Sequence, residues 1–496
     1  MAKISIGFIG GAYLARSRHV DMQECINLYP QRESPVQPPI GVQLVQPPSK
    51  NVGSLVGTPG LEVFSVPEVD GHVRGLLATS GGKCYAVIGN SVYTLSDSGQ
   101  ETFLGNVIPR NTLVGMADNG SAGHQVIIVD DERGWIINTK TDKLVPIDNF
   151  PGGSHVLFKD GRFIVNKPGT GQIYWSDSPG YNGLNWVEGS FATAESCPDN
   201  IISMEMTNNE IWLFGPNSYE IWQNDTNFVT GALSFARIPN AIGDIGTPAP
   251  YSPATMGNDI FWLGSNQRGH GVVWHNNGYQ PERISTHGIE YMITQMSRID
   301  DAIGYCYQQE GHFFYVLCFP TGNKTMVFDM TTGLWHERTW YKETTGSTYM
   351  HRGIVSTLYK NKILVGDREN SSVYWYNLDK YTDYGGAIVR VRTCPHIHNK
   401  MGRIFYNEFE VDMEKGGGLI QGQGSQPKAM LSWSDDGGFT FGKERWATSG
   451  KLGAYGTRVH WNSLGSSRNR IFRFKISDPI KVVLIESWID VEGSDV

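Results

Sequence analysis

The chain has 496 residues, 40% of them hydrophobic and 18% charged, so it is long enough for two or three domains and too apolar to be disordered. The formal net charge is −8 and no long basic run occurs, which argues against tight nucleic-acid binding. No apolar run reaches the roughly 18 residues of a membrane span. No basic segment precedes the mildly apolar start, so we expect no signal peptide and folding in the cytoplasm.

Residues 1–74 are expected to form an irregular N-terminal arm that leads into the first strands. Six prolines fall between positions 30 and 48. Because proline lacks a backbone donor and fixes φ, this stretch should be extended, neither helical nor sheet-forming. Two interpretations stay open: a linker, or an arm that lies on a neighbouring subunit.

Residues 75–387 show a loose repeat in which an apolar strand, a Gly/Asn/Asp turn and an aromatic-rich strand follow one another. KCYAVIGNSVYTL and NNEIWLFGPNSYEIWQND are two instances. The repeats are about 44 residues long, the size of a four-stranded propeller blade. The pattern predicts an all-β fold with a β-propeller of about seven blades, with six as the alternative. One helix is expected in HGIEYMITQMSRI, where apolar residues at helical spacing favour core packing over a binding site.

Residues 388–496 have longer strands with clean alternation, which predicts a C-terminal antiparallel β-sandwich. In RIFYNEFEVDME the expected buried face carries Phe405, Phe409 and Val411. The expected solvated face carries Glu408, Glu410 and Asp412. A calcium site on this acidic stripe is the less favoured alternative.

The segment SWSDDGGFTFG, residues 432–442, fits the Asp-box hairpin pattern found in sialidases and other propeller glycosidases. The matching residues are Ser434, Asp436, Gly438, Thr440 and Phe441. The carboxylate can accept bonds from backbone N–H groups of its own turn, and glycine supplies positive φ. We therefore expect a structural turn, with Phe441 directed inward.

A sialidase-like site has little else in its favour. Arg237 begins an Arg-Ile-Pro triplet, but it falls in the middle of the repeats, and no Tyr, Glu and Asp trio is marked. His396 and His398 with Cys394 are too tightly spaced for a structural zinc site. No Walker loop, HExxH or GxSxG motif occurs. We predict no catalytic, cofactor-binding or metal residues.

Six cysteines are scattered along the chain without a C-x-x-C pair, which favours reduced core thiols over a disulfide framework. They are Cys25, Cys84, Cys197, Cys306, Cys318 and Cys394.

Several segments, taken in order, resemble the packaged-DNA stabilisation proteins of short-tailed phages, also called tail hub or nozzle proteins. INLYPQ and GTPGLEVF are similar to the family's N-terminal signature, and AESCPDNIISMEMTNNEIWLFGPNSYEIW to a propeller segment. IGDIGTPAPYSP with the following helix is similar to a later propeller stretch. The region from SWSDDGGFTFGKERW through RIFRFKISDP is similar to the closing sandwich. The proline-rich stretch at 30–48 has no counterpart in this resemblance.

The resemblance implies a non-enzymatic virion protein that forms a hexameric ring below the portal and its adaptor ring. Such a ring extends the DNA channel, helps retain packaged DNA and anchors tail spikes or fibres, and a tail needle or plug is a further partner. Genomic DNA would pass through without sequence-specific binding and without membrane insertion, after assembly in the host cytoplasm. Two other classes stay open: a glycan-binding propeller adhesin and, less favoured, a sialidase-like glycosidase.

Overall fold

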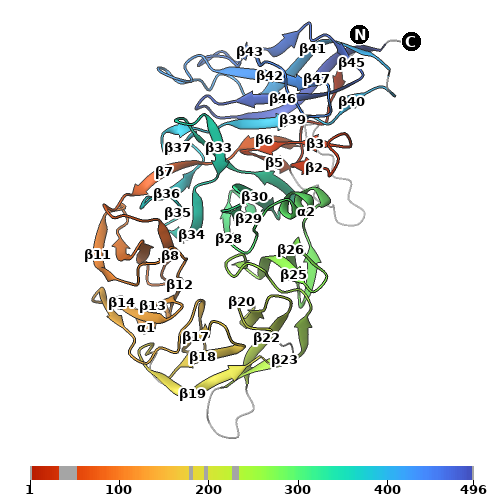
Figure 1. Cartoon of the computed structure of the whole chain (residues 1–496). Helices are drawn as coiled ribbons and strands as arrows, with labels where there is room; N and C mark the ends of the chain where they lie inside the picture. Colours follow the sequence, from red (N-terminus) through yellow and green to blue (C-terminus); the bar gives the residue numbers. More distant parts are fainter. Residues whose placement is uncertain are drawn as a thin grey trace, which may run out of the picture.

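The computed structural model describes residues 3–32, 53–177, 182–194, 199–225, 234–400 and 402–493. A ring of small antiparallel sheets forms the larger part, and a sandwich of longer strands lies against one side of that ring (Figure 1). The all-β propeller followed by a sandwich, as predicted from the sequence, is confirmed. No helix among the described residues is long and apolar enough to cross a membrane.

Within the described residues, six units of the ring are each built from four consecutive strands. The first unit contains β8 (Val73–Ala78), β9 (Cys84–Ile88), β10 (Ser91–Leu95) and β11 (Glu101–Asn106). The second contains β12 (Gly115–Asp118), β13 (Gln125–Asp130), β14 (Arg133–Asn138) and β15 (Lys143–Pro146). The third unit contains β16 (Val156–Lys159), β17 (Arg162–Asn166), β18 (Gln172–Ser176) and β19 (Trp186–Thr193). The fourth contains β20 (Ser203–Thr207), β21 (Glu210–Phe214), β22 (Tyr219–Asp225) and β23 (Ser234–Gly243). The fifth unit contains β24 (Ala254–Met256), β25 (Asp259–Asn266), β26 (Gly269–Asn277) and β27 (Gln280–Arg283). The sixth contains β28 (Ile303–Gln309), β29 (His312–Phe319), β30 (Lys324–Asp329) and β31 (Leu334–Glu337).

A composite unit closes the ring from both ends of the propeller sequence. It contains β34 (Gly353–Tyr359), β35 (Lys362–Asp367), β36 (Val373–Asn377) and, from the N-terminal side, β7 (Gly60–Ser65). Its inner strand β34 lies beside both β8 and β28, so no inner edge is left open. The estimate of about seven blades, or six, corresponds to six contiguous units plus this composite one.

The hairpins of the ring use the turn residues that the sequence supplies. Asp160 and Gly161 join β16 to β17 with φ of 50° and 81°, and Asn208 and Asn209 join β20 to β21 with φ of 49° and 63°. Two successive residues at positive φ give the tight turn that matches the twist of paired strands, and Asn, Asp and Gly tolerate it best.

The apolar cores of the propeller lie between neighbouring units. Trp212 of the fourth unit packs with Trp262 of the fifth, and Phe261 of the fifth stacks on Tyr315 of the sixth. The cluster that contains Leu364 and Val73 joins the composite unit to the first. Each sheet therefore buries its two faces only against its neighbours, as radial packing requires.

Two helices occur within the described residues. The short α1 (Gly120–Gly123) was not expected from the sequence. The predicted helix is confirmed as α2 (His287–Thr294), where Thr286 caps Ile289 and Ile293 is buried. Met292 is half-buried against the same core, so the apolar stripe is packing surface.

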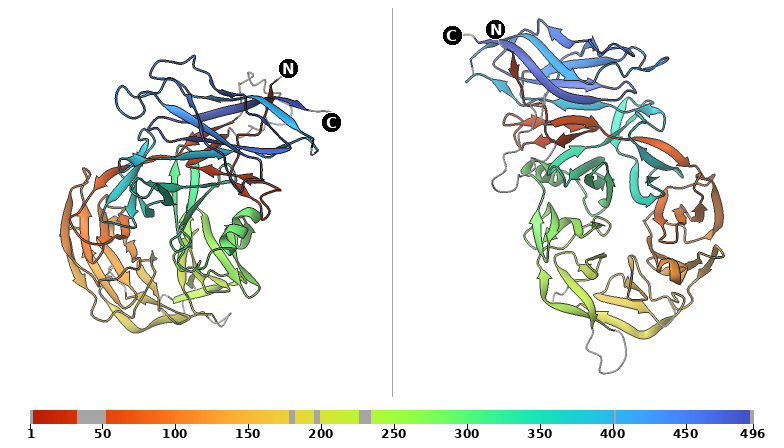
Figure 2. Two further views of the ribbon diagram at one scale, coloured as in Figure 1. Left: turned by 45° about the horizontal axis from the view of Figure 1, so that its top comes forward. Right: turned by 180° about the vertical axis from the view of Figure 1, so that it is seen from behind.

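The sandwich combines C-terminal strands with strands from the first 57 residues. One sheet has the order β44-β41-β47-β6-β5 with β1 beside β47, and the other runs through β4-β39-β46-β42-β43. Figure 2 shows the N-terminal strands lying between the ring and the C-terminal strands in both views. The N-terminal strands are β1 (Ile4–Ser5), β2 (Tyr13–Leu14), β3 (Met22–Gln23), β4 (Cys25–Ile26), β5 (Leu28–Arg32) and β6 (Gly53–Gly57). The C-terminal strands are β39 (Arg390–Thr393), β40 (Ile397–His398), β41 (Ile404–Met413), β42 (Lys428–Ser434), β43 (Arg445–Thr448), β44 (Val459–Asn462), β45 (Ser466–Ser467), β46 (Asn469–Ile476) and β47 (Val483–Gly493). Outside the sandwich, β32 (Thr339–Lys342) pairs with β33 (Ser347–Met350), and β37 (Thr382–Asp383) and β38 (Gly386–Ala387) extend the sheet of β7.

The expectation that the proline-rich stretch forms no sheet is wrong at its first residue. Pro30 lies in β5, opposite Leu55 of β6. Because β5 is at the end of its sheet, a strand there tolerates a residue without an N–H. Most of the stretch, from position 33 to 48, lies outside the described residues.

The expected faces of β41 are partly wrong. Phe409 and Val411 are buried as predicted, but Phe405 is 44% exposed and Asp412 is buried. The register with β47 shifts between Tyr406 and Glu408, which moves the buried apolar side chains from even to odd positions. Asp412 keeps the parity of Glu408 and Glu410 but is buried, with Lys415 at 3.3 Å from its carboxylate. A simple alternation could not reveal this bulge.

Glu408 and Glu410 lie on the outer face with basic partners. Lys3 reaches both carboxylates, and Arg458 donates to Glu408 at 2.8 Å and to Glu410 at 2.8 Å. These bonds hold the pKa of Glu410 at about 2. Lysine and arginine therefore occupy the place that a calcium ion would take.

The five described cysteines carry no disulfide bond, and Cys197 lies outside the described residues. Four of the five are buried, as expected of core thiols; they are Cys25, Cys84, Cys318 and Cys394.

Candidate functional site

The Asp-box turn follows β42, and its polar side chains are used within the turn. Asp436 Oδ1 accepts the hydroxyl of Ser434 at 2.6 Å and the backbone N–H groups of Phe439 and Thr440 at 2.9 and 3.0 Å. The Thr440 hydroxyl donates to Oδ2. The Ser434 and Thr440 bonds hold the pKa of Asp436 well below its usual range. A carboxylate bound in this way is poorly suited to act as a catalytic acid.

The same turn is covered by the N-terminal loop between β2 and β3. Gly437 and Gly438 have φ of 79° and 88°, and a Cβ on them would come within 2.6 Å of the His19 ring and 2.1 Å of the Met22 sulfur. Arg18 donates to the Gly438 carbonyl at 3.2 Å and lies over the Phe439 ring. The glycines are therefore needed both for the turn and for this close approach.

Phe441 connects the turn to the N-terminal segment by another route. Its ring is half-buried and lies 3.4 Å from the guanidinium carbon of Arg473. Arg473 forms a two-pronged ion pair with Glu24 at 2.8 and 2.9 Å. Phe441 thus packs inside the contact between β46 and the N-terminal strands.

Asn27, in the segment INLYPQ, joins the propeller to the sandwich. Its side chain donates to the carbonyl of Val389 at 2.9 Å and of Thr339 at 3.2 Å, and it accepts the Thr339 N–H at 2.9 Å. The residue is buried with φ of 53°, which asparagine tolerates better than most residues. Nothing in the sequence of this segment marks Asn27 for that role, because its partners are more than 300 positions away.

Beneath this joint lies a buried arginine that has aromatic partners. Arg338 donates to the hydroxyl of Tyr307, and its guanidinium lies over the rings of Tyr307, Phe314 and Tyr376 at 5.3 to 5.5 Å. Burial and the nearby Arg338 charge lower the pKa of His351 to about 3, so this imidazole is neutral. The run HERTWY gave no hint of an aromatic cage.

Near the same joint, Asp383 lies between the closing unit and the sandwich. Its Oδ1 accepts the Leu61 N–H at 3.1 Å. Burial raises the pKa of Asp383 to about 7, and burial lowers that of nearby Arg390 to about 10. The joint therefore contains buried ionisable groups, as the ring does at single contacts such as the Arg74–Asp130 ion pair at 2.9 Å.

Another carboxyl group, half-buried, lies near the centre of the ring. Glu205 on β20 accepts the hydroxyl of Thr255 on β24 at 3.2 Å. Burial raises the pKa of Glu205 to about 8, so the group is protonated at neutral pH. In the sequence, a charged residue inside the apolar segment SMEMT is the signal that could have indicated this carboxyl group.

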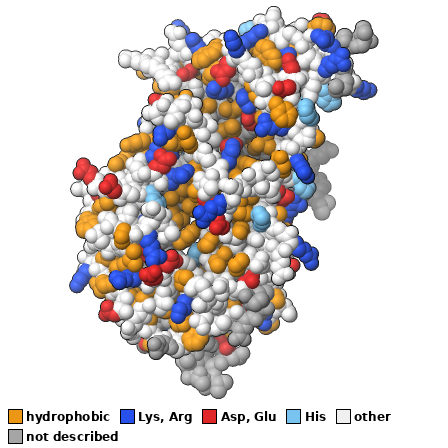
Figure 3. All heavy atoms as spheres, in the orientation of Figure 1, with side chains coloured by type: hydrophobic (Ala, Val, Ile, Leu, Met, Phe, Trp, Pro, Cys, Tyr) orange, Lys and Arg blue, Asp and Glu red, His pale blue; other side chains and the backbone are white. Residues whose placement is uncertain are grey.

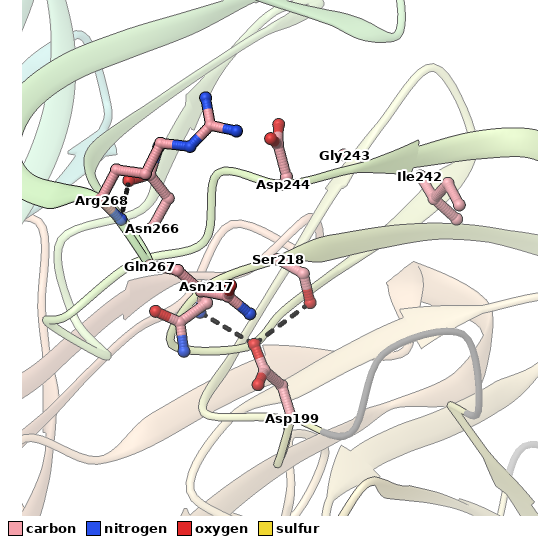
Figure 4. Close-up of a pocket in the computed structure, with 9 residues that line it drawn as sticks. All are labelled: Asp199, Asn217, Ser218, Ile242, Gly243, Asp244, Asn266, Gln267 and Arg268. Atoms are coloured by element: carbon pink, nitrogen blue, oxygen red, sulfur yellow. Dashed lines mark hydrogen bonds between the residues drawn. The ribbon is translucent and has the colours of Figure 1, made fainter.

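A cavity of about 480 Å³ opens where the turns of the fourth and fifth units meet (Figure 4). Asp199 accepts the Asn217 N–H at 2.9 Å and the Ser218 hydroxyl at 3.3 Å on one wall. The side chains of Asp244 and Arg268 extend from the opposite side in Figure 4. The cavity offers hydrogen-bonding groups of both kinds, with Ile242 as its apolar side chain.

The remaining residues that the sequence singled out do not converge on a site. Arg237 is exposed on the outer strand β23, opposite Trp222. His396 bonds to Asn469 and to the Arg18 carbonyl, and Cys394 is buried beside β46. Among the described residues, no group of three His, Cys, Asp or Glu side chains is placed to hold a metal ion.

Comparison with solved structures finds matches at low similarity. A streptogramin B lyase has 10% identity and a TM-score of 0.43, covering 64% of this chain and 98% of its own. A virginiamycin B lyase from Staphylococcus aureus has 8% identity and a TM-score of 0.42, with the same coverage. A chain of the mitotic checkpoint complex has 12% identity and a TM-score of 0.42, covering 68% of this chain and 99% of its own. These similarities support no argument about function, and no curated protein matches.

Two family models match the two parts of the fold. The one described as the β-propeller of bacteriophage P22 Gp10 matches residues 41–382, and the one described as its β-sandwich matches residues 389–492. These two matches, which cover most of the chain, define its class: a structural phage tail protein. The chain belongs to the bacteriophage P22 Gp10 family, and the resemblance found in its sequence is confirmed.

Proposed function

We propose that the chain is the tail hub of a short-tailed phage. Six copies form a ring below the portal and its adaptor, extend the DNA channel, help retain packaged DNA and anchor tail spikes or fibres, with a needle or plug as a further partner. The observation that carries the proposal is the match of both domains, in order, to the Gp10 models.

The architecture supports a load-bearing role. Every propeller unit packs against two neighbours, and the N-terminal strands pair with both the ring and the sandwich. A closed ring of sheets has few free edges at which foreign strands could add. Such a body can transmit force between the portal side and the spike side of a tail without rearranging.

The charge of the chain suits a DNA passage. Each copy carries −8, so six would carry about −48 if ionised normally. A negative wall repels phosphate and lets DNA slide without adhering. The role is non-enzymatic: the Asp-box carboxylate is bound within its turn, and the family is structural.

The test is electron microscopy of the purified chain mixed with the portal–adaptor complex of its phage. A six-fold ring attached to the adaptor is expected. A ring of another copy number, or no attachment, would refute the assignment. Light scattering of the free chain checks a second expectation. Because each copy has a net charge of −8, the copies should associate weakly without the adaptor.

The cavity between the fourth and fifth units supports a second candidate, binding of host-surface glycans. Paired carboxylate, guanidinium and amide groups beside one aliphatic side chain could hold vicinal hydroxyls of a sugar. A glycan array probed with the native chain and with Arg268→Ala tests this. Equal signals from both proteins, or none, would remove the candidate.

A further inference from the structure

We infer that the subunits of the proposed ring meet through two specific surfaces: a basic groove on one flank and an acidic loop on the opposite flank. The inference rests on the proposed ring and names the contact that would build it. A head-to-tail ring needs two different, complementary surfaces on each copy.

The basic groove lies between the N-terminal hairpin, α2 and the Asp-box turn. Its volume is about 520 Å³, and its apolar floor includes Leu14, Tyr291, Met292 and Phe439. Arg16 and Arg18 form its rim, and no acidic side chain lines it. Within the described part of the chain, neither arginine has an ion-pair partner.

The groove is held in shape by contacts already described. Arg18 is fixed by the Gly438 carbonyl and the Phe439 ring, and α2 is capped by Thr286. Because the walls come from three separate parts of the fold, the groove forms only once those parts have docked. A preformed apolar floor with a cationic rim selects an acidic segment that also carries aliphatic side chains.

The acidic loop connects β7 to β8 on the other flank. Glu68 and Asp70 are exposed there, and Val63 and Val66 are each 44% exposed beside them. The loop is rigid in its backbone: the Pro67 carbonyl accepts the Val69 N–H at 2.9 Å and the Ser371 hydroxyl at 2.7 Å. It offers the acidic groups that the groove lacks and aliphatic side chains that can pack on the apolar floor of the groove.

The two surfaces lie on opposite sides of the molecule just below the sandwich. Figure 1 shows the end of β7 on the left and α2 with β2 on the right, and the reverse view in Figure 2 agrees. Figure 3 shows acidic side chains gathered at the left edge near the end of β7. Copies related by rotation about an axis beside the molecule therefore bring a loop toward the next groove.

Charge reversal tests the contact in the full-length chain. Arg16→Glu with Arg18→Glu, and separately Glu68→Lys with Asp70→Lys, should each weaken ring formation on the adaptor about tenfold or more, because like charges then face each other. Arg133→Glu and Asp148→Lys are matched controls on exposed residues elsewhere, and they should assemble like the native chain. Circular dichroism verifies that all variants fold.

Mixing the two reversed chains gives the decisive result. Each fails alone, but a mixture pairs an acidic groove with a basic loop and a basic groove with an acidic loop. The mixture should form rings in which the two chains alternate, as six positions permit, and a chain with both faces reversed should also assemble. Native-level assembly of either single-face variant, or failure of the mixture, would overturn the inference.

Sedimentation equilibrium of the free chains separates this inference from the proposed function. Weak pairwise association that shows the same loss and rescue, without any six-fold ring, would leave the contact standing and refute the tail-hub assignment. A six-fold ring that forms equally well with all four substitutions would refute the contact and leave the tail-hub assignment standing. Neither association nor a ring would refute both.

Discussion

The propeller and the joint beneath the sandwich are stabilised in different ways. Between propeller units the contacts are mainly apolar and repeated, as where Trp212 meets Trp262, with polar exceptions such as the bond between Thr255 and Glu205. At the joint they are polar and unique, as where Asn27 bonds to Thr339 and Val389, far away in the sequence. Repeated apolar contacts tolerate changes in detail, whereas a buried polar contact fails when one partner is removed. The first region should resist variation, and the second should fix how the two domains are oriented.

The largest loss of stability is expected from an apolar truncation in the ring. Trp262→Ala removes a fully buried ring between the fourth and fifth units and should lower the free energy of unfolding by about 4 kcal/mol. Leu358→Ala, at a residue that is 67% exposed, is the control and should change it by less than about 0.5 kcal/mol. Urea unfolding measures the free energy of unfolding of both variants. It is followed by backbone circular dichroism, because tryptophan fluorescence would itself change with Trp262. A small effect of Trp262→Ala would mean that the interface relaxes around the cavity.

A smaller but more selective loss is expected at the joint. Asn27→Ala leaves one buried N–H donor and two carbonyls without partners, and should cost about 3 kcal/mol. Asn27→Gly keeps the positive φ and isolates the hydrogen-bond contribution. Calorimetry should show the propeller and sandwich transitions moving apart. A single transition that only shifts would show that Asn27 does not couple the domains.

The half-buried carboxyl group of Glu205 gives a pH-dependent effect. The pKa of Glu205 is about 8 in the folded chain and ordinary, near 4.3, in the unfolded one. The unfolded chain therefore releases this proton first as the pH rises, so stability is full below about pH 4 and falls until about pH 8. Glu205→Gln should be more stable than the native chain by about 2 kcal/mol at pH 8.5 and similar at pH 4. Thermal unfolding at both values measures this; an equal effect at both would contradict it.

The smallest effect is expected at the Asp-box turn. Asp436→Ala removes the acceptor of two backbone N–H groups, so the sandwich should melt a few degrees lower. Asp436→Asn keeps one acceptor oxygen and should lose less. Both forms should lack activity on a fluorogenic sialoside. Turnover that the native chain shows and the alanine variant loses would restore the sialidase interpretation.

Sequence patterns predicted most of the repeated part of the fold and little of the joint. Strand and turn residues recur in each unit, so errors in one repeat do not change the architecture. The position of Phe405 was missed because a bulge breaks the alternation, and nothing in a two-residue period marks a bulge. Asn27 and Arg338 were missed because their partners are distant in sequence. The Asp box was found because its acceptor and donors are neighbours in the chain.

The closing of the ring by β7 has a consequence for synthesis. Glu62 bonds to Asn377, 315 positions later, so the ribosome must finish nearly the whole propeller before β7 can dock. At usual elongation rates that delay is roughly 15 to 60 seconds. Until then the nascent chain exposes an unpaired strand and the apolar faces of two units, a state that is prone to aggregation.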